Sequence, residues 1–278
     1  MEELKVSVLL CVYNPVRSYF LQAVRSIVNQ TMQEWELIIV DDGSSEEHRD
    51  VFREAAALDD RIRLIHKDEN RGLAAAMNEA VSHAGARYLA RMDADDISEP
   101  DRLRVQYDFL ENHPEYQWAG SNTDLIDDNG RWGTRKLPEI PDTSDFLKYS
   151  PYIHPSVMFR AEVLHQCGGY HITRRGEDYE LFMRLHAQGM RGYNIQEVLF
   201  SYRESMGTYR HRDFRSCVEE VRIRREGFRR LGMHSPLAAF SIIKPLFVAF
   251  VPYFLLVRIK KKARKEMYVE RYSDSQTF

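Results

Sequence analysis

Three aspartates, Asp93, Asp95 and Asp96, directly follow the apolar run at residues 88–92. A strand over that run would deliver all three carboxylates to one place at its carboxyl end. Hard divalent cations prefer oxygen ligands, and Mg²⁺ usually takes one or two protein carboxylates and completes its shell with water and substrate phosphates. The cluster therefore predicts a site for Mn²⁺ or Mg²⁺ that also holds a nucleotide diphosphate. Taken alone, it is better explained by a solvated acidic turn before a helix.

Predicted strands and helices alternate along the first hundred residues, and they must position these carboxylates. We expect strands at residues 6–12, 37–40, 61–65 and 88–92, the first of them a short apolar run suited to burial on both faces, and helices at residues 17–29, 45–58 and 72–83. Ser44 and Glu47 have the spacing of a capping box for the second helix. This alternation predicts an α/β fold of the Rossmann-like, doubly wound kind with a mostly parallel sheet.

Ligands of such sheets bind outside the carboxyl ends of the strands, where Asp42 and Arg71 also fall. A carboxylate at Asp42 can accept from a nucleobase imide or a ribose hydroxyl, and the guanidinium of Arg71 can face a phosphate. Neither a G-x-G-x-x-G segment after the first strand nor a P-loop is present. A divalent metal and an arginine must therefore bind the phosphates. Together with Asp42, they predict a site for a nucleotide-sugar.

Composition separates an acidic part of the chain from a basic one. The chain has 278 residues and a net charge of −3, yet residues 201–278 carry 17 Lys and Arg against 8 Asp and Glu. Its three cysteines, Cys11, Cys167 and Cys217, include no C-x-x-C pair, which argues against a disulfide framework or a zinc site and fits a reducing cytosol. We expect no secretory signal, because a strand already begins at residue 6.

Several segments together resemble the GT-A-fold glycosyltransferases of family 2, inverting enzymes that make bacterial surface polysaccharides. The resemblance covers residues 5–205 and follows the order and spacing of the family. It rests on residues 7–14 (SVLLCVYN), 30–31 (QT), 37–44 (LIIVDDGS), 70–78 (NRGLAAAMN), 92–96 (MDADD), 154–158 (HPSVM) and 177–178 (ED). It implies a GT-A fold and a nucleotide-sugar donor.

The resemblance also implies roles for individual residues. It places in the donor site Cys11, Tyr13, Asp42, Arg71, Asp93 and Asp95, with Asp95 and Asp93 at the metal. Cys11 would lie beside the nucleobase that Asp42 recognises, and Arg71 would approach the diphosphate. Many family members carry Tyr-Arg-x-His after the last strand, whereas residues 202–205 here read YRES. This departure leaves open whether a histidine ligates the metal, with His211 as the candidate.

The acceptor side needs a base. An acceptor hydroxyl that attacks opposite the departing diphosphate needs a carboxylate on that face and a Lewis acid on the leaving group. Asp178 precedes a helical run, and at a helix amino terminus the dipole favours an ionised carboxylate. A plain N-cap explains Asp178 at least as well from the residues alone. The resemblance assigns the base to Asp178 and places Glu177 and His154 on the acceptor side.

Other acceptor-side candidates are less specific. Trp118, Trp132 and Tyr152 are aromatic side chains that could stack on a sugar, although most aromatics belong to the core. A lone histidine beside a strand is more often structural than functional, which leaves the role of His154 open. We expect donor and acceptor specificity to depend on loops between residues 122 and 150.

The last third of the chain predicts two helices. Residues 213–231 have amphipathic spacing, and Gly232 follows them; the expected apolar face comprises Phe214, Cys217, Val218, Val221 and Phe228. Residues 237–257 contain 17 apolar residues and precede a basic run at 258–265. That length could span a bilayer, but Lys244, two prolines and basic flanks on both sides oppose a single span. An interfacial or re-entrant helix pair on anionic lipid fits better, with a core helix or a dimer interface as the alternative.

These features predict a GT-A catalytic domain at residues 1–205, with a nucleotide-sugar-binding half (1–100) and an acceptor half (101–205). A basic, helical, membrane-associating extension (206–278) would follow. We expect metal-dependent, inverting transfer from a nucleoside diphosphate sugar, most simply a UDP-sugar, to a hydroxyl of a lipid-linked saccharide in cell-surface polysaccharide biosynthesis.

We expect a peripheral or monotopic enzyme on the cytoplasmic face of the plasma membrane, without a nucleic acid partner and with a homodimer left open. The alternatives are transfer to a polyprenyl phosphate, a nucleotidyltransferase, or, outside enzymes, a membrane-associated scaffold. The nucleotidyltransferase usually needs a Gly-rich, Lys-containing loop after the first strand, which residues 11–15 (CVYNP) do not provide.

Overall fold

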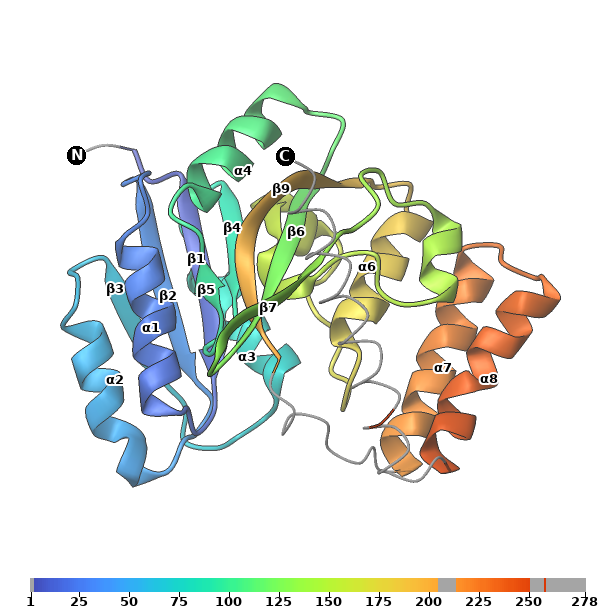
Figure 1. Ribbon diagram of the computed structural model, residues 1–278, viewed down its shortest axis with the longest axis horizontal. Helices are drawn as coiled ribbons and strands as arrows, with labels where there is room; N and C mark the ends of the chain where they lie inside the picture. Colours follow the sequence, from blue (N-terminus) through green and yellow to red (C-terminus); the bar gives the residue numbers. More distant parts are fainter. Residues whose placement is uncertain (1–2, 205–213, 251–257, 259–278) are drawn as a thin grey trace.

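The computed structural model describes residues 3–204, 214–250 and 258. Within them, nine strands form one sheet, with helices on both of its faces (Figure 1). In order across the sheet the strands are β3 (Ile62–His66), β2 (Trp35–Asp41), β1 (Val6–Val12), β4 (Tyr88–Met92), β8 (Met158–Arg160), β6 (Trp118–Asp127), β9 (Gly192–Arg203) and β5 (Ile97–Ser98), and β7 (Gly130–Arg135) pairs with β6.

The first four strands of that order are parallel, as predicted. β1 lies between β2 and β4, and its alternate residues enter two cores. Val8 belongs to the core shared with α1 (Arg17–Val28), α2 (Arg49–Ala56) and α4 (Arg102–Asn112). Leu9 belongs to the opposite core, shared with α3 (Leu73–His83), α5 (Ala161–Gln166) and α6 (Glu177–Ala187). A strand covered on both faces is apolar throughout, which is why this half was readable from the sequence.

Beyond β4 the sheet is mixed, so the predicted mostly parallel sheet is wrong for this half. β8 runs antiparallel to β4 and β6, β6 runs parallel to β9, and β5 runs antiparallel to β9. The predicted specificity loops at residues 122–150 also begin as a β6–β7 hairpin. The sequence did not predict β6, because this strand contains buried polar residues. The buried side chain of Asn122, for example, donates to the carbonyl of Gln196 and accepts from the backbone N–H of Leu137.

The helices of the first hundred residues match their predicted positions with one correction. The predicted capping box before α2 is absent: the 3₁₀ turn η1 (Glu46–His48) precedes the helix, and its N-cap Ser45 makes no side-chain capping bond. Ser44, the predicted cap, instead accepts a hydrogen bond from the backbone N–H of Asn14 at 2.8 Å. This bond joins the loops that follow β2 and β1, so tertiary contact replaced the local cap.

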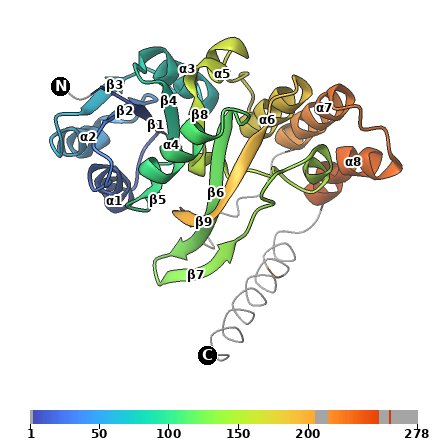
Figure 2. The same ribbon diagram turned by 90° about the horizontal axis from the view of Figure 1, so that it is seen from above.

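Two helices extend the domain beyond α6, at the end of the molecule opposite β3 (Figure 2). They are α7 (Phe214–Arg230) and α8 (Pro236–Phe250). α7 packs against α6, where Gly227 leaves room for the side chain of Met183. Phe214 and Val218 are exposed, so the predicted apolar face of α7 is wrong at these two positions.

α8 is joined to the rest of the protein by a buried polar contact. The Ser241 hydroxyl donates to the carbonyl of Leu147 at 2.6 Å and accepts from Arg224 of α7 at 3.0 Å. Among the described residues, no helix combines the length and apolarity that a bilayer crossing requires. His211, residues 251–257 and residues 259–278 lie outside the described residues.

Candidate active site

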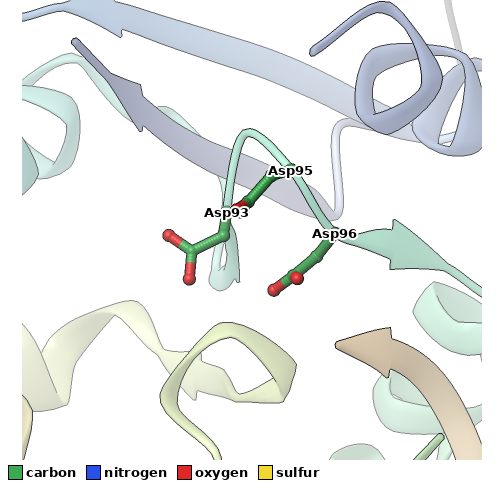
Figure 3. Close-up of side chains that lie close together, drawn as sticks. All are labelled: Asp93, Asp95 and Asp96. Carbon is green, nitrogen blue, oxygen red and sulfur yellow. The ribbon is translucent and has the colours of Figure 1, made fainter. Parts of the chain in front are cut away.

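The three aspartates predicted to hold a metal do come together, in the loop after β4 (Figure 3). One ligand oxygen from each of Asp93, Asp95 and Asp96 lies within 4.8 Å of the others. Asp96 is buried; its Oδ1 accepts from the backbone N–H of Arg203 at 2.7 Å, and its Oδ2 has no partner among the described residues. An unpaired, buried carboxylate oxygen beside two further carboxylates suits a hard divalent cation.

Burial and the close approach of three carboxylates make their ionised forms unfavourable. Desolvation by the surrounding protein and the charge of Asp93 raise the pKa of Asp95 to about 6, although its side chain reaches solvent. Burial and the two neighbouring carboxylates raise the pKa of Asp96 well above its usual range. A bound divalent cation would remove this repulsion, so metal affinity and pH are linked at this site.

We expect Mn²⁺ to raise the melting temperature more at pH 7.5 than at pH 5. Folding raises the pKa of Asp95, so the protonated carboxyl favours the folded state. This contribution to stability is complete below pH 3.8, the pKa of an unfolded aspartate, and is lost as the pH rises through about 6. Above pH 6 the metal replaces the lost protons, whereas at pH 5 it must compete with them. Thermal melts with Mn²⁺ and with EDTA at both pH values measure the effect, with Asp95→Asn as control. Equal shifts at both pH values would contradict it.

Arg203, at the end of β9, holds the acidic loop in place. Its Nε donates to the carbonyl of Asp95 at 2.7 Å, and its Nη2 donates to Gln22 of α1 at 2.7 Å. Its guanidinium also lies 4.1 Å from the centre of the Tyr19 ring. Sequence reasoning noted residues 202–205 only for a missing histidine; the position of Arg203 at the end of the last strand was the signal that could have revealed its role.

Two buried arginines, also missed from the sequence, lie behind the acidic loop. Arg91 of β4 is 2% exposed and forms an ion pair with Asp93. Arg102 of α4 is fully buried, and its Nη2 donates to the carbonyl of Arg91 at 2.7 Å. Their positive charges partly offset the acidic loop from the protein interior.

The predicted donor-side residues outside the acidic loop lie at the carboxyl ends of β1 and β2 and in the loop between β3 and α3. Asp42 is buried and accepts from the backbone N–H groups of Arg71 at 3.1 Å and Gly72 at 2.8 Å, so it fixes the loop before α3. Gly72 has φ +87°, which favours glycine. The Arg71 guanidinium is exposed, and its Nε and Nη2 donate to Glu69 at 2.9 and 2.6 Å.

The two predicted donor residues of the first strand differ in exposure. Cys11 is buried against Met77, with 3.5 Å between the sulfur atoms, and burial raises the pKa of its thiol to about 12. The thiol is therefore neutral and unreactive at neutral pH. Tyr13, in the loop that follows β1, is half exposed and free to contact a ligand.

The acceptor-side carboxylates lie in the first turn of α6. Gly176, in the left-handed conformation, is the N-cap, and Glu177 and Asp178 follow it. Burial raises the pKa of both carboxyls, while the charge of Arg91 lowers both. Burial therefore acts on Asp178 against the helix dipole, and its role as the ionised base stays a prediction.

The remaining acceptor-side candidates are buried. His154, in the 3₁₀ turn η3 (His154–Ser156), lies 2.8 Å from the Tyr170 hydroxyl through its Nε2, and burial lowers its pKa well below 6.5. It is therefore neutral at pH 7. Trp118, Trp132 and Tyr152 are at most 7% exposed and belong to the interior, so they present no face on which an acceptor sugar could stack.

Comparison with known proteins decides the family. The family model described as glycosyl transferase family 2 matches residues 7–182. The chain belongs to glycosyltransferase family 2. It is 38% identical to EpsE of Bacillus subtilis, which carries a provisional glycosyltransferase name, over 93% of this chain and 94% of that protein. It is 28% identical to the Escherichia coli enzyme named UDP-Gal:alpha-D-GlcNAc-diphosphoundecaprenol beta-1,3-galactosyltransferase, over 93% and 96% of the two chains.

Solved structures show the same fold at low sequence identity. TarS of S. aureus in complex with UDP-GlcNAc superposes with a TM-score of 0.67 at 16% identity, covering 88% of this glycosyltransferase and 72% of TarS. The mannosyltransferase PcManGT of Pyrobaculum calidifontis, in complex with GDP-Man and Mn²⁺, gives 0.62 at 17% identity, covering 95% and 83%. The predicted GT-A fold is therefore confirmed for this glycosyltransferase.

Proposed function

We propose that this glycosyltransferase moves a sugar, with inversion, from a UDP-sugar to a hydroxyl of a lipid-linked saccharide during cell-surface polysaccharide synthesis, and that a divalent metal assists it. The observation that carries the proposal is the carboxylate cluster of Asp93, Asp95 and Asp96, which follows β4 at the same edge of the sheet as the loops that follow β1 and β2. The name of the Escherichia coli relative, which contains a UDP-sugar and a diphosphoundecaprenol-linked sugar, supports the substrate classes.

The residues divide the work between donor and acceptor. Asp93 and Asp95 would hold Mn²⁺ or Mg²⁺, which supplies Lewis-acid stabilisation of the charge on the departing diphosphate. Asp42 keeps the loop before α3 in place, where the nucleotide would lie. Asp178 accepts the proton of the attacking hydroxyl, and its raised pKa makes it a stronger base than an ordinary aspartate. No covalent intermediate is needed.

A hydrolysis screen tests the donor side without requiring the acceptor. Purified protein is incubated with Mn²⁺ and a panel of UDP-, GDP- and dTDP-sugars, and release of the nucleoside diphosphate is measured. Slow release from one UDP-sugar, abolished by EDTA, is the expected result. Absence of release from every donor, together with absence of nucleotide binding, would overturn the proposed function.

We further propose that α8 docks on an anionic membrane surface at the cytoplasmic face. Leu237, Phe240, Ile243 and Phe247 are spaced along one face of α8 and are 42% to 60% exposed. Exposed arginines of α7, at 215, 222, 225 and 229, lie on the adjacent helix. Exposed apolar side chains on one helix and exposed basic ones on its neighbour match an interface of acyl chains and anionic headgroups. The basic run at 258–265 adds charge of the same sign.

A paired substitution tests this docking. Phe240→Glu with Phe247→Glu should lower binding to anionic vesicles by at least about tenfold at low salt, because burial of each phenylalanine contributes roughly 1.5 to 3 kcal/mol. Vesicle sedimentation measures the bound fraction, and hydrolysis of the donor should stay unchanged. Ile140→Glu with Tyr149→Glu, two exposed positions outside α7 and α8, is the matched control. Equal loss in both variants, or none in either, would contradict membrane docking.

A further inference from the structure

A cavity of about 320 Å³ lies between α6 and α7, two helices that run side by side (Figures 1 and 2). Its lining comes from the loop before α6, from α6 itself and from α7. In the part of the chain that the structure describes, the three clustered aspartates do not line it. Cavities of this size hold small ligands in other proteins, so this one is a candidate site separate from the metal cluster.

The loop before α6 connects this cavity to the proposed base. Residues 171–173 of the loop line the cavity, and the loop ends at Gly176, which caps α6 next to the first turn that contains Asp178. Glu180 and Arg184 then line the cavity from α6. At about 1.5 Å per residue, they lie roughly 3 to 9 Å beyond Asp178 along the helix axis. That separation fits a saccharide with one sugar in the cavity and its reacting hydroxyl near Asp178.

Hydrogen bonds hold this loop on both sides of the cavity. The side chain of Asn78, in α3, donates to the carbonyl of Tyr170 at 2.9 Å and accepts from the Tyr170 backbone N–H at 2.8 Å. The backbone N–H of Arg174 donates to Glu219 of α7 at 3.1 Å. The loop is therefore fixed to α3 before the cavity and to α7 after it, so the cavity is preformed, as ligand sites usually are.

The charges that line the cavity balance one another. Three carboxylates and three guanidinium groups line it: Glu180, Glu219, Glu226, Arg184, Arg222 and Arg230. Glu180 Oε1 lies 3.0 Å from Arg184 Nε and 3.9 Å from Arg230 Nη1, and it also lies 3.0 Å from Nδ1 of His171. A diphosphate here would meet three carboxylates without an excess of positive charge. The lining therefore suits a neutral polar ligand.

Glu219 and Arg222 have hydrogen-bonding capacity that the protein does not use. They are three residues apart and so lie on one face of α7. Arg222 is exposed, and its guanidinium forms no hydrogen bond or ion pair with the described residues; Glu219 accepts only the Arg174 N–H among them. Sugar hydroxyls both donate and accept, so a guanidinium beside a carboxylate can bind two neighbouring hydroxyls. Ile172, 66% exposed, adds an apolar surface for the C–H groups of a sugar ring.

We infer that this cavity binds a neutral sugar unit of the acceptor saccharide, with Arg222 donating to its hydroxyl groups and Glu219 accepting from them. The inference rests on the proposed function and specifies its acceptor, which has at least one neutral sugar beyond the unit whose hydroxyl attacks. The diphosphate of the acceptor lies outside the cavity, because three carboxylates would face it there.

Disaccharide binding to the purified protein tests the inference. Saturation-transfer NMR gives dissociation constants for cellobiose, lactose, N-acetyllactosamine and chitobiose, and calorimetry without metal uses pyrophosphate as the anionic probe. We expect the wild type to bind at least one disaccharide and Arg222→Ala to bind it at least about tenfold more weakly, because hydrogen bonds to a charged group are lost. Glu219→Gln keeps an acceptor for the Arg174 N–H but loses the charge, and it should weaken disaccharide binding less.

Arg25→Ala is the matched control, because Arg25 of α1 is also exposed and has no hydrogen bond or ion pair among the described residues. It should bind the disaccharide as the wild type does, and melting temperatures establish that each variant folds. If no disaccharide binds, or if Arg222→Ala and Arg25→Ala bind it equally, the inference is overturned. Pyrophosphate that binds more weakly to Arg222→Ala and more tightly to Glu219→Gln would identify an anion site instead.

UDP with Mn²⁺ separates the inference from the proposed function. Added to the disaccharide complex, it should not displace the sugar; displacement would place the sugar in the donor site and contradict the inference. A wild type that binds a disaccharide but no UDP would keep the saccharide cavity and refute the proposed function. A wild type that binds UDP but no disaccharide would refute the inference alone.

Discussion

Asp95→Asn is expected to lower sugar transfer by roughly 10³-fold, because metal stabilisation of a leaving diphosphate is worth several kcal/mol and about 1.4 kcal/mol corresponds to a factor of ten. Asn keeps the shape of the side chain but replaces the charged oxygen with a weaker ligand. The fold should survive, since the side chain of Asp95 is the most exposed of the cluster. Transfer assays with Mn²⁺, alongside circular dichroism, measure both effects.

Two comparisons make the Asp95→Asn result specific to the metal. EDTA should reproduce the loss in the wild type, and excess Mn²⁺ should restore activity there but only weakly in the variant. Asp108→Asn, an exposed aspartate of α4, is the matched control and should transfer normally. Undiminished turnover of the wild type in excess EDTA would eliminate the metal-dependent mechanism.

Asp178→Asn should lower transfer by roughly 10² to 10⁴-fold while leaving donor binding intact, because general-base catalysis contributes about that factor. The wild-type rate should fall on the acid side at a pH above the ordinary aspartate pKa of 3.8, since burial raises the pKa of Asp178 and a protonated carboxyl accepts no proton. The acid limb of this profile should disappear in the variant. Rates from pH 4 to pH 8, with a soluble acceptor analogue, measure both.

Glu177→Gln is the control for Asp178→Asn, because Glu177 is the neighbouring carboxylate with the same direction of pKa change. It should affect acceptor binding more than the rate. If Glu177→Gln loses the rate and Asp178→Asn does not, Glu177 is the base. If neither loses the rate, a phosphate oxygen of the acceptor becomes the better candidate nucleophile, because such an oxygen needs no strong carboxylate base.

The parts of the fold predicted from the sequence are those with local causes. β1, β2 and β4 are short apolar runs because helices cover both faces of the parallel half, and α1 and α3 show apolar residues at helical spacing. β6 was missed because its buried polar residues, such as Asn122, find partners far along the chain. β8 has only three residues, too few to show a pattern.

The same distinction holds at the site. Asp93, Asp95 and Asp96 are neighbours in sequence, so their convergence follows from one strand end. Arg203 reaches them from more than a hundred residues away, and no spacing rule predicts such a contact. The raised pKa of Asp178 was not predicted, because the helix terminus is visible in the sequence whereas the depth at which it is buried is not.

The hydrogen bond from the Arg203 amide to Asp96 gives the protein an internal reporter. This amide donates to a carboxylate whose charge must change whenever a proton or a cation joins the cluster. The strength of the bond depends on how much negative charge remains on that oxygen. The chemical shift and exchange rate of the Arg203 amide proton should therefore change when a proton or a cation binds the acidic loop. This proton belongs to β9, a strand that contributes no carboxylate to the cluster. Nuclear magnetic resonance could follow cation binding there without any label on the ligand.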